Sequence, residues 1–513
     1  MKTQRLLHDS LLAAADESGA KTAVATQEES LAYADVLDRA SRLARSLQEH
    51  GLERGDRVAI LMDNTAACTI SIFAASLAGG VFIVVNPQTK ADKLAYILND
   101  SEAAVLLTEG TLARVFAPAV EQAPRLKAVV CASPGEGSGP VLDLDELIAG
   151  AEPAPRNLGT IPVDLAALIY TSGSTGNPKG VMMTHANMVF TAGSLIEYLR
   201  LGPDDRILSV LPLAFDYGLY QWLMTVRLGA TLALERSFVY PARTLMRLEE
   251  EGITVFPGVP TVFATLLGMR AEKEFPSVTR ITNTAAALPP TFHEGLAERF
   301  PNALVFRMYG LTECKRVSYL EPELVHEKPT SVGRAIPGTE TFVLDTEGRP
   351  VAPGETGVLY VRGPHVMAGY WGAPELSAHM LKDGPVPGER MLCTHDFFTV
   401  DEDGLLYFIG RSDDIIKTRG EKVSPIEVEN ALFSIEGVQE AAVLGFPDEV
   451  LGEAIRAYVV LEDGASIGEQ GIIAACRTRL ESFMVPKEVV LLDELPKTAT
   501  GKIRKKSLLE PAG

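Results

Sequence analysis

A glycine-rich segment carries the clearest chemical signal in the sequence. Residues 170–180 read YTSGSTGNPKG; they follow the apolar run 166–170 and precede a helix that we expect to begin near Thr184. Glycines let the backbone approach a ligand closely, hydroxyl groups donate to phosphate oxygens, and Lys179 adds positive charge. The segment is not a Walker loop, because Pro178 precedes the lysine and a glycine follows it. We therefore predict a phosphate-binding loop; the alternative is a flexible surface turn.

Further polar motifs follow this loop in a fixed order. They read YGLTE (309–313), THDFFTVDEDG (394–404), GRSDD (410–414) and PKTATGKI (496–503). Together with the loop they resemble the motifs of the AMP-forming adenylating enzymes, a superfamily of acyl-CoA synthetases, stand-alone adenylation enzymes of nonribosomal peptide synthesis and beetle luciferases. The resemblance covers nearly the whole chain. One such motif alone would be weak evidence, whereas the ordered set is specific.

The resemblance implies a two-step ligase reaction. A carboxylate attacks the α-phosphate of ATP and forms an acyl- or aminoacyl-adenylate with release of pyrophosphate. A pantetheine thiol, of CoA or of a carrier protein, then displaces AMP. Two anions must meet in the first step, so the site has to neutralise charge and orient both reactants. The implied cofactors are ATP and Mg²⁺.

The ATP-binding residues can be carried over from these motifs. The resemblance assigns ATP to Thr171, Ser172, Gly173, Ser174, Thr175, Gly176, Lys179, Tyr309, Gly310, Asp396, Phe408 and Arg411. Tyr309 would stack on adenine, and Asp396 would accept hydrogen bonds from the ribose hydroxyls with help from Arg411. His395 stands where the family usually has glycine, so we expect the local backbone to differ there while ribose binding survives.

Three residues are expected to act on the reacting groups. The resemblance places Thr312 at the α-phosphate and Glu313 on Mg²⁺, a hard cation that prefers oxygen ligands. Lys502 would be the catalytic lysine, reaching the carboxylate and the α-phosphate. A bland interpretation exists for Lys502, since it lies in a basic tail; we expect its neighbours at 504–506 to be ordinary solvated charges.

The resemblance also implies a division into two domains. Residues 1–410 would bind ATP and the acid, and residues 411–513 would form a mobile domain that carries Lys502. Asp413 occupies the hinge position at which the small domain rotates between the two half-reactions. Gly420 matches the loop beside the pantetheine tunnel, although an ordinary turn glycine is a plausible alternative.

The identity of the acid stays open at this stage. The substrate-binding candidates are Phe215, Asp216, Tyr217, Gly258, Ala285, Ala286 and Ala287. Amino-acid-activating relatives also carry Phe-Asp here, and that aspartate pairs with the substrate ammonium; a buried carboxylate needs such a partner. Some acyl ligases read Phe-Asp-Tyr-Gly as well, so a fatty or aryl acid is the leading interpretation. The alanine run replaces a segment that usually contains glycine, which favours a smaller acid.

Two other classes of protein need consideration. A regulatory nucleotide-binding protein without turnover would be expected to lack Lys179, Glu313 or Lys502, and all three are present. A luciferase-like oxygenase would share every adenylation motif. The thiol acceptor, CoA or a carrier protein acting in trans, is equally open.

The elements around these motifs predict an α/β fold. Short apolar runs rich in β-branched residues alternate with segments of helical spacing, which indicates parallel sheets with helices on both faces. From residue 339 the pattern changes to short alternating strands with glycine turns, so we expect a β-rich subdomain there. Residues 424–435 predict a helix, because Ser424 is a good cap, Pro425 suits the first turn and Glu427 follows three residues after the cap. We expect a small α+β domain after residue 410.

The composition limits the remaining choices. The chain has 513 residues, 46% hydrophobic, and a formal net charge of -20, which disfavours a general nucleic-acid binder. Its cysteines show no metal-ligand spacing and no secreted framework, and its N-terminus shows no signal peptide. The uncharged stretch 64–89 reads as a buried helix followed by a buried strand, not as a membrane span. We therefore expect a cytoplasmic enzyme; the oligomeric state is not predicted.

Overall fold

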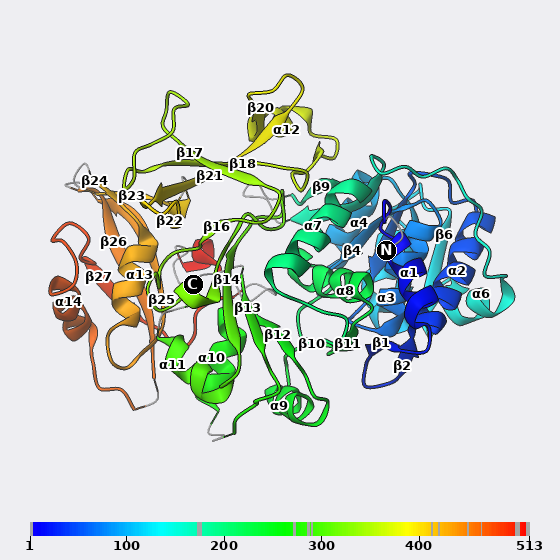
Figure 1. The fold of residues 1–513 in the computed structure, drawn as a ribbon, viewed down its shortest axis with the longest axis horizontal. Coiled ribbons are helices and arrows are strands. Elements are labelled where there is room, and N and C mark those ends of the chain that lie inside the picture. Colours follow the sequence, from blue (N-terminus) through cyan, green and yellow to red (C-terminus); the bar gives the residue numbers. More distant parts are fainter. Residues whose placement is uncertain are drawn as a thin grey trace.

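Two large sheets with helices between and around them are built from the part of the chain up to β16 (Arg334–Ala335), with β19 (Gly369–Tyr370) added from further along the sequence (Figure 1). In this computed structural model the described residues are 4–171, 177–269, 273–284, 288, 291–411, 414–418, 421–448, 451–462, 464–497 and 503–508. Two smaller sheets follow in the C-terminal part. This arrangement confirms the predicted α/β class, with a large N-terminal domain of sheets and a small C-terminal domain.

The first large sheet is built on the apolar runs near the N-terminus. Its strand order is β19-β9-β8-β4-β3-β5-β6-β7, and the pairs from β8 to β7 are parallel. Every residue of β4 is buried, as expected for a parallel strand covered on both faces. The strands are β3 (Arg57–Leu61), β4 (Val81–Val85), β5 (Ala103–Glu109), β6 (Ala128–Ala132), β7 (Leu142–Asp143), β8 (Leu165–Thr171), β9 (Lys179–Thr184) and β19 (Gly369–Tyr370). The helices of this region are α2 (Tyr33–Glu49), α3 (Ala66–Leu77), α4 (Ala91–Asp100), α5 (Ala113–Val120) and α6 (Leu144–Gly150), with the short helix η1 (Gly110–Leu112).

The second large sheet has the order β16-β15-β14-β13-β12-β10-β11-β1-β2. Its strands are β1 (Thr22–Ala25), β2 (Ser30–Ala32), β10 (Arg206–Ser209), β11 (Thr231–Leu234), β12 (Val255–Gly258), β13 (Arg280–Asn283), β14 (Leu304–Tyr309), β15 (Ser318–Leu320) and β16 (Arg334–Ala335). The accompanying helices are α1 (Asp9–Ser18), α7 (His185–Tyr198), α8 (Asp216–Leu228), α9 (Pro241–Glu250), α10 (Pro260–Gly268), α11 (Phe292–Arg299) and η2 (Pro322–Leu324). The strands β10 to β14 are parallel, so their carboxyl ends lie at one edge.

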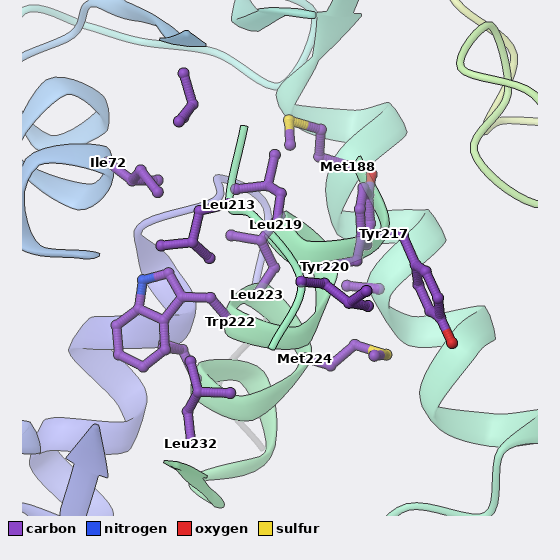
Figure 2. Packing of buried hydrophobic residues seen from close by; sticks show 14 of the residues in the cluster. Ile72, Met188, Leu213, Tyr217, Leu219, Tyr220, Trp222, Leu223, Met224 and Leu232 are labelled. Atoms are coloured by element: carbon purple, nitrogen blue, oxygen red, sulfur yellow. The ribbon is translucent and has the colours of Figure 1, made fainter. Parts of the chain in front are cut away.

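Helix α8 lies inside the core of the large domain. All residues from Tyr217 to Val226 are buried, and a helix that is apolar all round is typical of such a position. Figure 2 shows Trp222 among side chains from several elements, including Ile72 and Leu232. The indole N–H of Trp222 donates to the Thr69 carbonyl at 3.3 Å, so its polar edge is satisfied. The packing of α8 fixes the position of its N-terminus, where Asp216 lies.

The C-terminal part contains the two smaller sheets. The β-rich segment has the order β17-β18-β21-β20, with β22 paired to β21. Its elements are β17 (Glu340–Leu344), β18 (Gly357–Arg362), α12 (Pro374–Met380), β20 (Leu381–Asp383), β21 (Arg390–Val400) and β22 (Leu406–Arg411). The last sheet comprises β23 (Ile416–Thr418), β24 (Glu421–Val423), β25 (Val438–Asp448), β26 (Gly452–Leu461) and β27 (Glu488–Leu491), with α13 (Pro425–Phe433), α14 (Glu469–Arg477) and η3 (Lys505–Leu508). In Figure 1 its elements are orange to red and lie across β12 to β14 from the blue N-terminal elements.

Several local predictions are confirmed, and one strand was not predicted. The uncharged stretch forms buried α3 and β4, and within the described residues no helix is long and apolar enough to cross a membrane. Ser424 caps α13 by accepting from the Glu427 N–H. The helix expected near Thr184 is α7, which begins at His185 with Thr184 as its cap, but the unpredicted strand β9 lies between it and the glycine-rich segment. The loop therefore connects the two strands of an antiparallel hairpin, β8 and β9.

Candidate active site

The ends of the phosphate loop are held by the β8–β9 hairpin. Thr171 and Lys179 are paired across the two strands, at the point where the chain leaves and rejoins the hairpin. A Cβ atom on Gly180 would lie 3.3 Å from the Tyr170 ring and 3.4 Å from Trp371, so this position leaves little room for a side chain. Residues 172–176, which complete the predicted loop, lie outside the described residues.

Glu313 is attached to the same sheet edge through Tyr370. Strand β19 pairs with β9, placing Tyr370 opposite Val181. The Tyr370 hydroxyl donates to Glu313 Oε1 at 2.5 Å, and burial together with this carboxylate raises the pKa of Tyr370. A backbone bond from Met367 N–H to the Glu313 carbonyl, 2.8 Å long, fixes the turn. The predicted metal ligand and the neck of the phosphate loop are thus brought to one place.

Tyr309, Asp396 and Phe408 meet at the predicted adenosine position. Tyr309 ends β14 and donates its hydroxyl to Asp396 Oδ2. Its ring stacks on Phe408, with centroids 5.6 Å apart, and meets Phe398 edge to face at 4.9 Å. Burial, reinforced by the Asp396 carboxylate, raises the pKa of Tyr309 well above its usual value. These residues come from β14, β21 and β22. Tyr309 and Phe408 supply an aromatic surface, and Asp396 supplies the acidic group.

Arg411 and His395 flank Asp396. Arg411 lies directly opposite Asp396 in the β21–β22 ladder, a pairing in which oppositely charged side chains interact favourably. His395 adopts φ +57°, a left-handed conformation that glycine adopts at no steric cost. Its ring stacks on His379 with centroids 4.5 Å apart. Burial, with the nearby Lys382 charge, lowers the pKa of His395.

The turn after Tyr309 is unusually compact. Thr312 and Glu313 lie in it, and its next residues are Cys314 and Lys315. A Cβ on Gly310 would lie 2.3 Å from the Lys315 carbonyl oxygen, so only glycine fits there. Lys315 itself has φ +67° and is 1% exposed. Its Nζ has no hydrogen-bond partner among the described residues, and burial lowers its pKa.

Asp216 lies beside a positive charge supplied by the chain itself. It is the first residue of α8, where a helix favours an acidic side chain. Arg316 Nη1 lies 3.6 Å from Asp216 Oδ2, and the Arg316 side chain is 5% exposed. The guanidinium also lies 4.8 Å from the centre of the Tyr217 ring, a cation–π distance. Phe215 precedes α8 and is half-buried.

Two further candidates for the acid pocket lie next to each other. The Tyr217 hydroxyl lies 2.7 Å from both the carbonyl and the hydroxyl oxygen of Thr282 on β13. Gly258 ends β12 and is paired with Asn283 on the same neighbouring strand. A side chain at Gly258 would meet the Phe263 ring at 2.6 Å. Burial raises the pKa of Tyr217 to about 12, so the hydroxyl is neutral.

A β-bridge joins the described residues on either side of the segment that carries Lys502. Lys497 and Ile503 form an antiparallel bridge, and Lys497 Nζ pairs with Glu440 at 2.5 Å. Lys505 Nζ lies 2.9 Å from Glu429 on α13. The expectation of a solvated charge is therefore wrong for Lys505, which anchors the segment to the small domain.

Some predicted positions lie outside the described residues. They are Ser172 to Gly176 in the loop, Ala285, Ala286 and Ala287, the hinge candidate Asp413, Gly420 and Lys502. Their roles stay predictions.

The site also contains residues that the motifs did not single out. Tyr370 gave no signal, because its partner Glu313 is 57 positions away in the sequence. Lys315 and Arg316 follow YGLTE almost directly, so two adjacent cations after that motif were a visible signal. The burial of these two side chains could not be predicted from the sequence.

The donor set at Glu313 fits Mg²⁺ that is shared with a nucleotide. Within the described ranges there is no group of three or more His, Cys, Asp or Glu side chains that could hold a metal ion. Mg²⁺ commonly takes one or two protein carboxylates and completes its shell with phosphates and water. Glu313 offers hard oxygen ligands beside the phosphate loop, so the residues present are compatible with this mode.

Comparisons with known proteins agree with this geometry. Residues 11–371 match the family model described as AMP-binding enzyme, and residues 427–502 match that of the AMP-binding enzyme C-terminal domain. The chain is 36% identical to a feruloyl-CoA synthase of Amycolatopsis sp, covering 94% of each chain. It is 32% identical to a long-chain-fatty-acid–CoA ligase of Bacillus subtilis, covering 96% of this chain and 91% of that one.

Solved structures extend the likeness to three dimensions. ATP-bound MatB from Rhodopseudomonas palustris superposes with a TM-score of 0.90 at 29% identity, covering 99% of this chain and 98% of that one. The anthranilate CoA ligase AuaEII in complex with anthranoyl-AMP gives 0.91 at 26% identity, with 99% and 97% covered. With family motifs, two family models and full-length relatives in agreement, the chain belongs to the AMP-binding enzyme family and is one of its AMP-forming acid–thiol ligases.

Proposed function

We propose that the protein activates a carboxylic acid without an ammonium group, fatty or aryl, and transfers the acyl group to CoA. ATP and the acid would form an acyl-adenylate and pyrophosphate, and the CoA thiol would then release AMP. The observation that carries the choice of acid is the Asp216–Arg316 pair, 3.6 Å apart. Because Asp216 already has a positive partner within the chain, it does not need a substrate ammonium to balance its charge.

Two relatives that are covered nearly completely support the same choice, whereas tyrocidine synthase 3 of Brevibacillus parabrevis, 29% identical over 99% of this chain, is matched over only 8% of its own length. Those with the names feruloyl-CoA synthase and long-chain-fatty-acid–CoA ligase align along nearly their whole length. The neighbour described as an anthranilate CoA ligase holds the adenylate of an aryl acid, and the amino group of that acid is an aryl amine and not the ammonium group of an amino acid. These likenesses support a fatty or aryl acid and a CoA acceptor in this chain.

Each residue of the site has a role in the proposed reaction. The phosphate loop, from Thr171 to Lys179, would hold the β- and γ-phosphates. The Tyr309–Phe408 wall would receive adenine, and Asp396 would bind the ribose. Glu313 would hold Mg²⁺, which neutralises phosphate charge when bound. Thr312 would contact the α-phosphate.

The C-terminal domain would supply the positive charge of Lys502. We propose the boundary at Arg411, the last residue of β22, with Asp413 as hinge and Gly420 beside the thiol path. Lys502 would approach the carboxylate and the α-phosphate during adenylation and move away for the thiol step. Lys497 and Ile503, on either side of Lys502 in the sequence, form an antiparallel bridge, which supports attachment of this part of the chain to the small domain.

The test is ATP–pyrophosphate exchange over a panel of acids. The panel pairs each amino acid with its deaminated analogue and adds aryl acids and fatty acids of increasing length. Exchange with plain acids, followed by acyl-CoA formation, is the expected result. Exchange confined to amino compounds would overturn the proposal in favour of an aminoacyl-adenylating enzyme that loads a carrier protein, and light emission with a luciferin would indicate an oxygenase.

Lys502→Ala is the matched variant for this experiment. It should lower adenylate formation about 10²–10³-fold, the usual effect of removing a group that stabilises developing charge. Thioester formation from supplied acyl-adenylate should persist. An equal loss in both half-reactions would contradict the role assigned to Lys502.

A further inference from the structure

Lys315 combines two unfavourable features at one position. Its backbone has φ +67°, a left-handed conformation that is unfavourable for a residue with a side chain. Its ammonium group is buried and has no hydrogen-bond partner within the described part of the chain. Glycine at this position would remove both costs. Residues that break local rules in this way are expected at functional sites, where the missing partner is a ligand.

The position of Lys315 indicates which ligand. It lies in the turn between β14 and β15, two residues after Glu313, and its carbonyl packs against Gly310. Glu313 and Asp216 are the acidic side chains whose charges act on its ammonium group. Among the described residues neither forms an ion pair with it. The ammonium is therefore within electrostatic reach of Glu313, on the proposed nucleotide side, and of Asp216, on the proposed acid side.

The charges around this point do not balance within the chain. The N-terminus of α8 contributes Asp216, and the turn contributes Lys315 and Arg316. The Arg316 guanidinium is the one that approaches Asp216, at 3.6 Å, and its Nη1 also donates to the Lys315 carbonyl at 2.7 Å. With Glu313 assigned to Mg²⁺ and Asp216 beside Arg316, the positive charge of Lys315 remains. A bound carboxylate would neutralise it, whereas a zwitterionic amino acid would not.

We propose that Lys315 is a substrate-binding residue whose ammonium group pairs with a carboxylate oxygen of the bound acid. The inference rests on the proposed function and deepens it, because it assigns the cation that receives the acid. The carboxylate has two possible sources: the group that reacts with ATP, or a second carboxylate on a dicarboxylic acid. Lys315 belongs to the large domain, so this contact would exist independently of Lys502.

The test compares Lys315→Met, which keeps length and removes charge, with Lys315→Arg, which keeps the charge. Lys328→Met is the matched control, because Lys328 pairs with Asp401 at 2.9 Å in the β-rich part, outside the proposed site. Pyrophosphate exchange is measured with monocarboxylic acids and with dicarboxylic acids of equal length. Lys315→Met should raise KM for the acid about 10- to 100-fold, as expected for loss of a charged hydrogen bond. KM for ATP should stay unchanged, and Lys315→Arg should recover part of the loss.

The pattern of KM changes over the two acid series identifies which carboxylate pairs with Lys315. An equal loss with both series assigns Lys315 to the reacting carboxylate, and thioester formation from supplied acyl-adenylate then stays normal. A loss confined to dicarboxylic acids assigns it to a second carboxylate. Wild-type KM values for every acid in Lys315→Met would overturn the inference while leaving the proposed function intact.

Lys315→Gly separates substrate binding by the ammonium group from a structural role of the side chain. The glycine variant relieves the backbone conformation and should melt at or above the wild-type temperature, so it replaces the methionine variant if that one does not fold. A loss of activity in Lys315→Gly that affects ATP and the acid equally would show a structural role and overturn the inference. Failure of the wild-type protein to support exchange with any acid would overturn the proposed function itself.

Discussion

The hydroxyl of Tyr370 orients the carboxylate that is proposed to hold Mg²⁺. It donates to Glu313 Oε1 at 2.5 Å from a buried position. Tyr370→Phe removes this bond and keeps the ring, so we expect the fold to persist and the carboxylate to lose its orientation. KM for Mg·ATP should rise about threefold to tenfold, which is less than for loss of a direct charged hydrogen bond, because the hydroxyl only orients the carboxylate. Initial-rate kinetics of pyrophosphate exchange at varied Mg·ATP measure this.

A comparable tyrosine provides the control for this prediction. The Tyr407 hydroxyl donates to Asp401 at 2.9 Å, so Tyr407→Phe removes the same kind of bond away from the proposed site. It should leave KM for Mg·ATP unchanged. If both variants behave alike, the role assigned to Tyr370 is wrong.

The residues of the candidate site were predictable only in part. Tyr309, Asp396 and Glu313 stand in motifs, because each was expected to touch ATP or the metal. Tyr370 supports Glu313 from a distant strand, and no local pattern indicates such a contact. Lys315 follows its motif in the sequence, yet its burial depends on the packing of α8 against the β14–β15 turn.

At the scale of elements, the turn between β14 and β15 requires a glycine at position 310. Its close contact is between Gly310 and the backbone of Lys315, where a Cβ would lie 2.3 Å from the carbonyl oxygen. Gly310→Ala must displace this turn, which carries Thr312 and Glu313. We expect an activity loss of at least about tenfold together with a lower melting temperature, since overpacking typically costs about 1–3 kcal/mol. Exchange assays and thermal unfolding measure the two effects.

Gly150→Ala is the matched glycine variant. Gly150 ends α6, and a Cβ there would meet nothing within 4 Å. Its melting temperature should be unchanged or slightly higher, because alanine restricts the unfolded chain. If Gly310→Ala were as well tolerated as Gly150→Ala, the contact inferred at the turn would be wrong.

Local patterns predicted the buried strands and helices better than the connections. Strand β4 is apolar throughout, and the cap at Ser424 is encoded within four residues, so both were visible. Strand β9 was missed because it is stabilised by pairing with β8 and with distant β19. Strands β23 and β24 were missed for a similar reason: they form a short hairpin within a polar stretch.

At the scale of the whole molecule, buried histidines couple folding to pH. Burial lowers the pKa of His185, His293 and His365 to about 4 in each case. Their pKa in an unfolded chain is about 6.5. Between these values the unfolded chain binds protons that the folded protein does not, so stability is complete above about pH 6.5 and is lost as the pH falls toward 4. His185 and His365, whose side chains are buried, can each contribute a loss of up to about 3 kcal/mol over this window, and the half-buried His293 contributes less because solvent screens its charge.

His365→Leu tests this coupling at one site. The His365 side chain is fully buried, and leucine fills a similar volume without a group that can be protonated. We expect the melting temperature of the variant to fall less steeply than that of the wild-type protein between pH 6.5 and 4. Above pH 6.5 the plots of melting temperature against pH should be nearly parallel for the two proteins. Scanning calorimetry across this range measures both slopes. The exposed His50 provides the control, because His50→Leu should leave the slope unchanged. Parallel curves for His365→Leu and the wild-type protein throughout the acidic range would show that His365 does not contribute to the coupling.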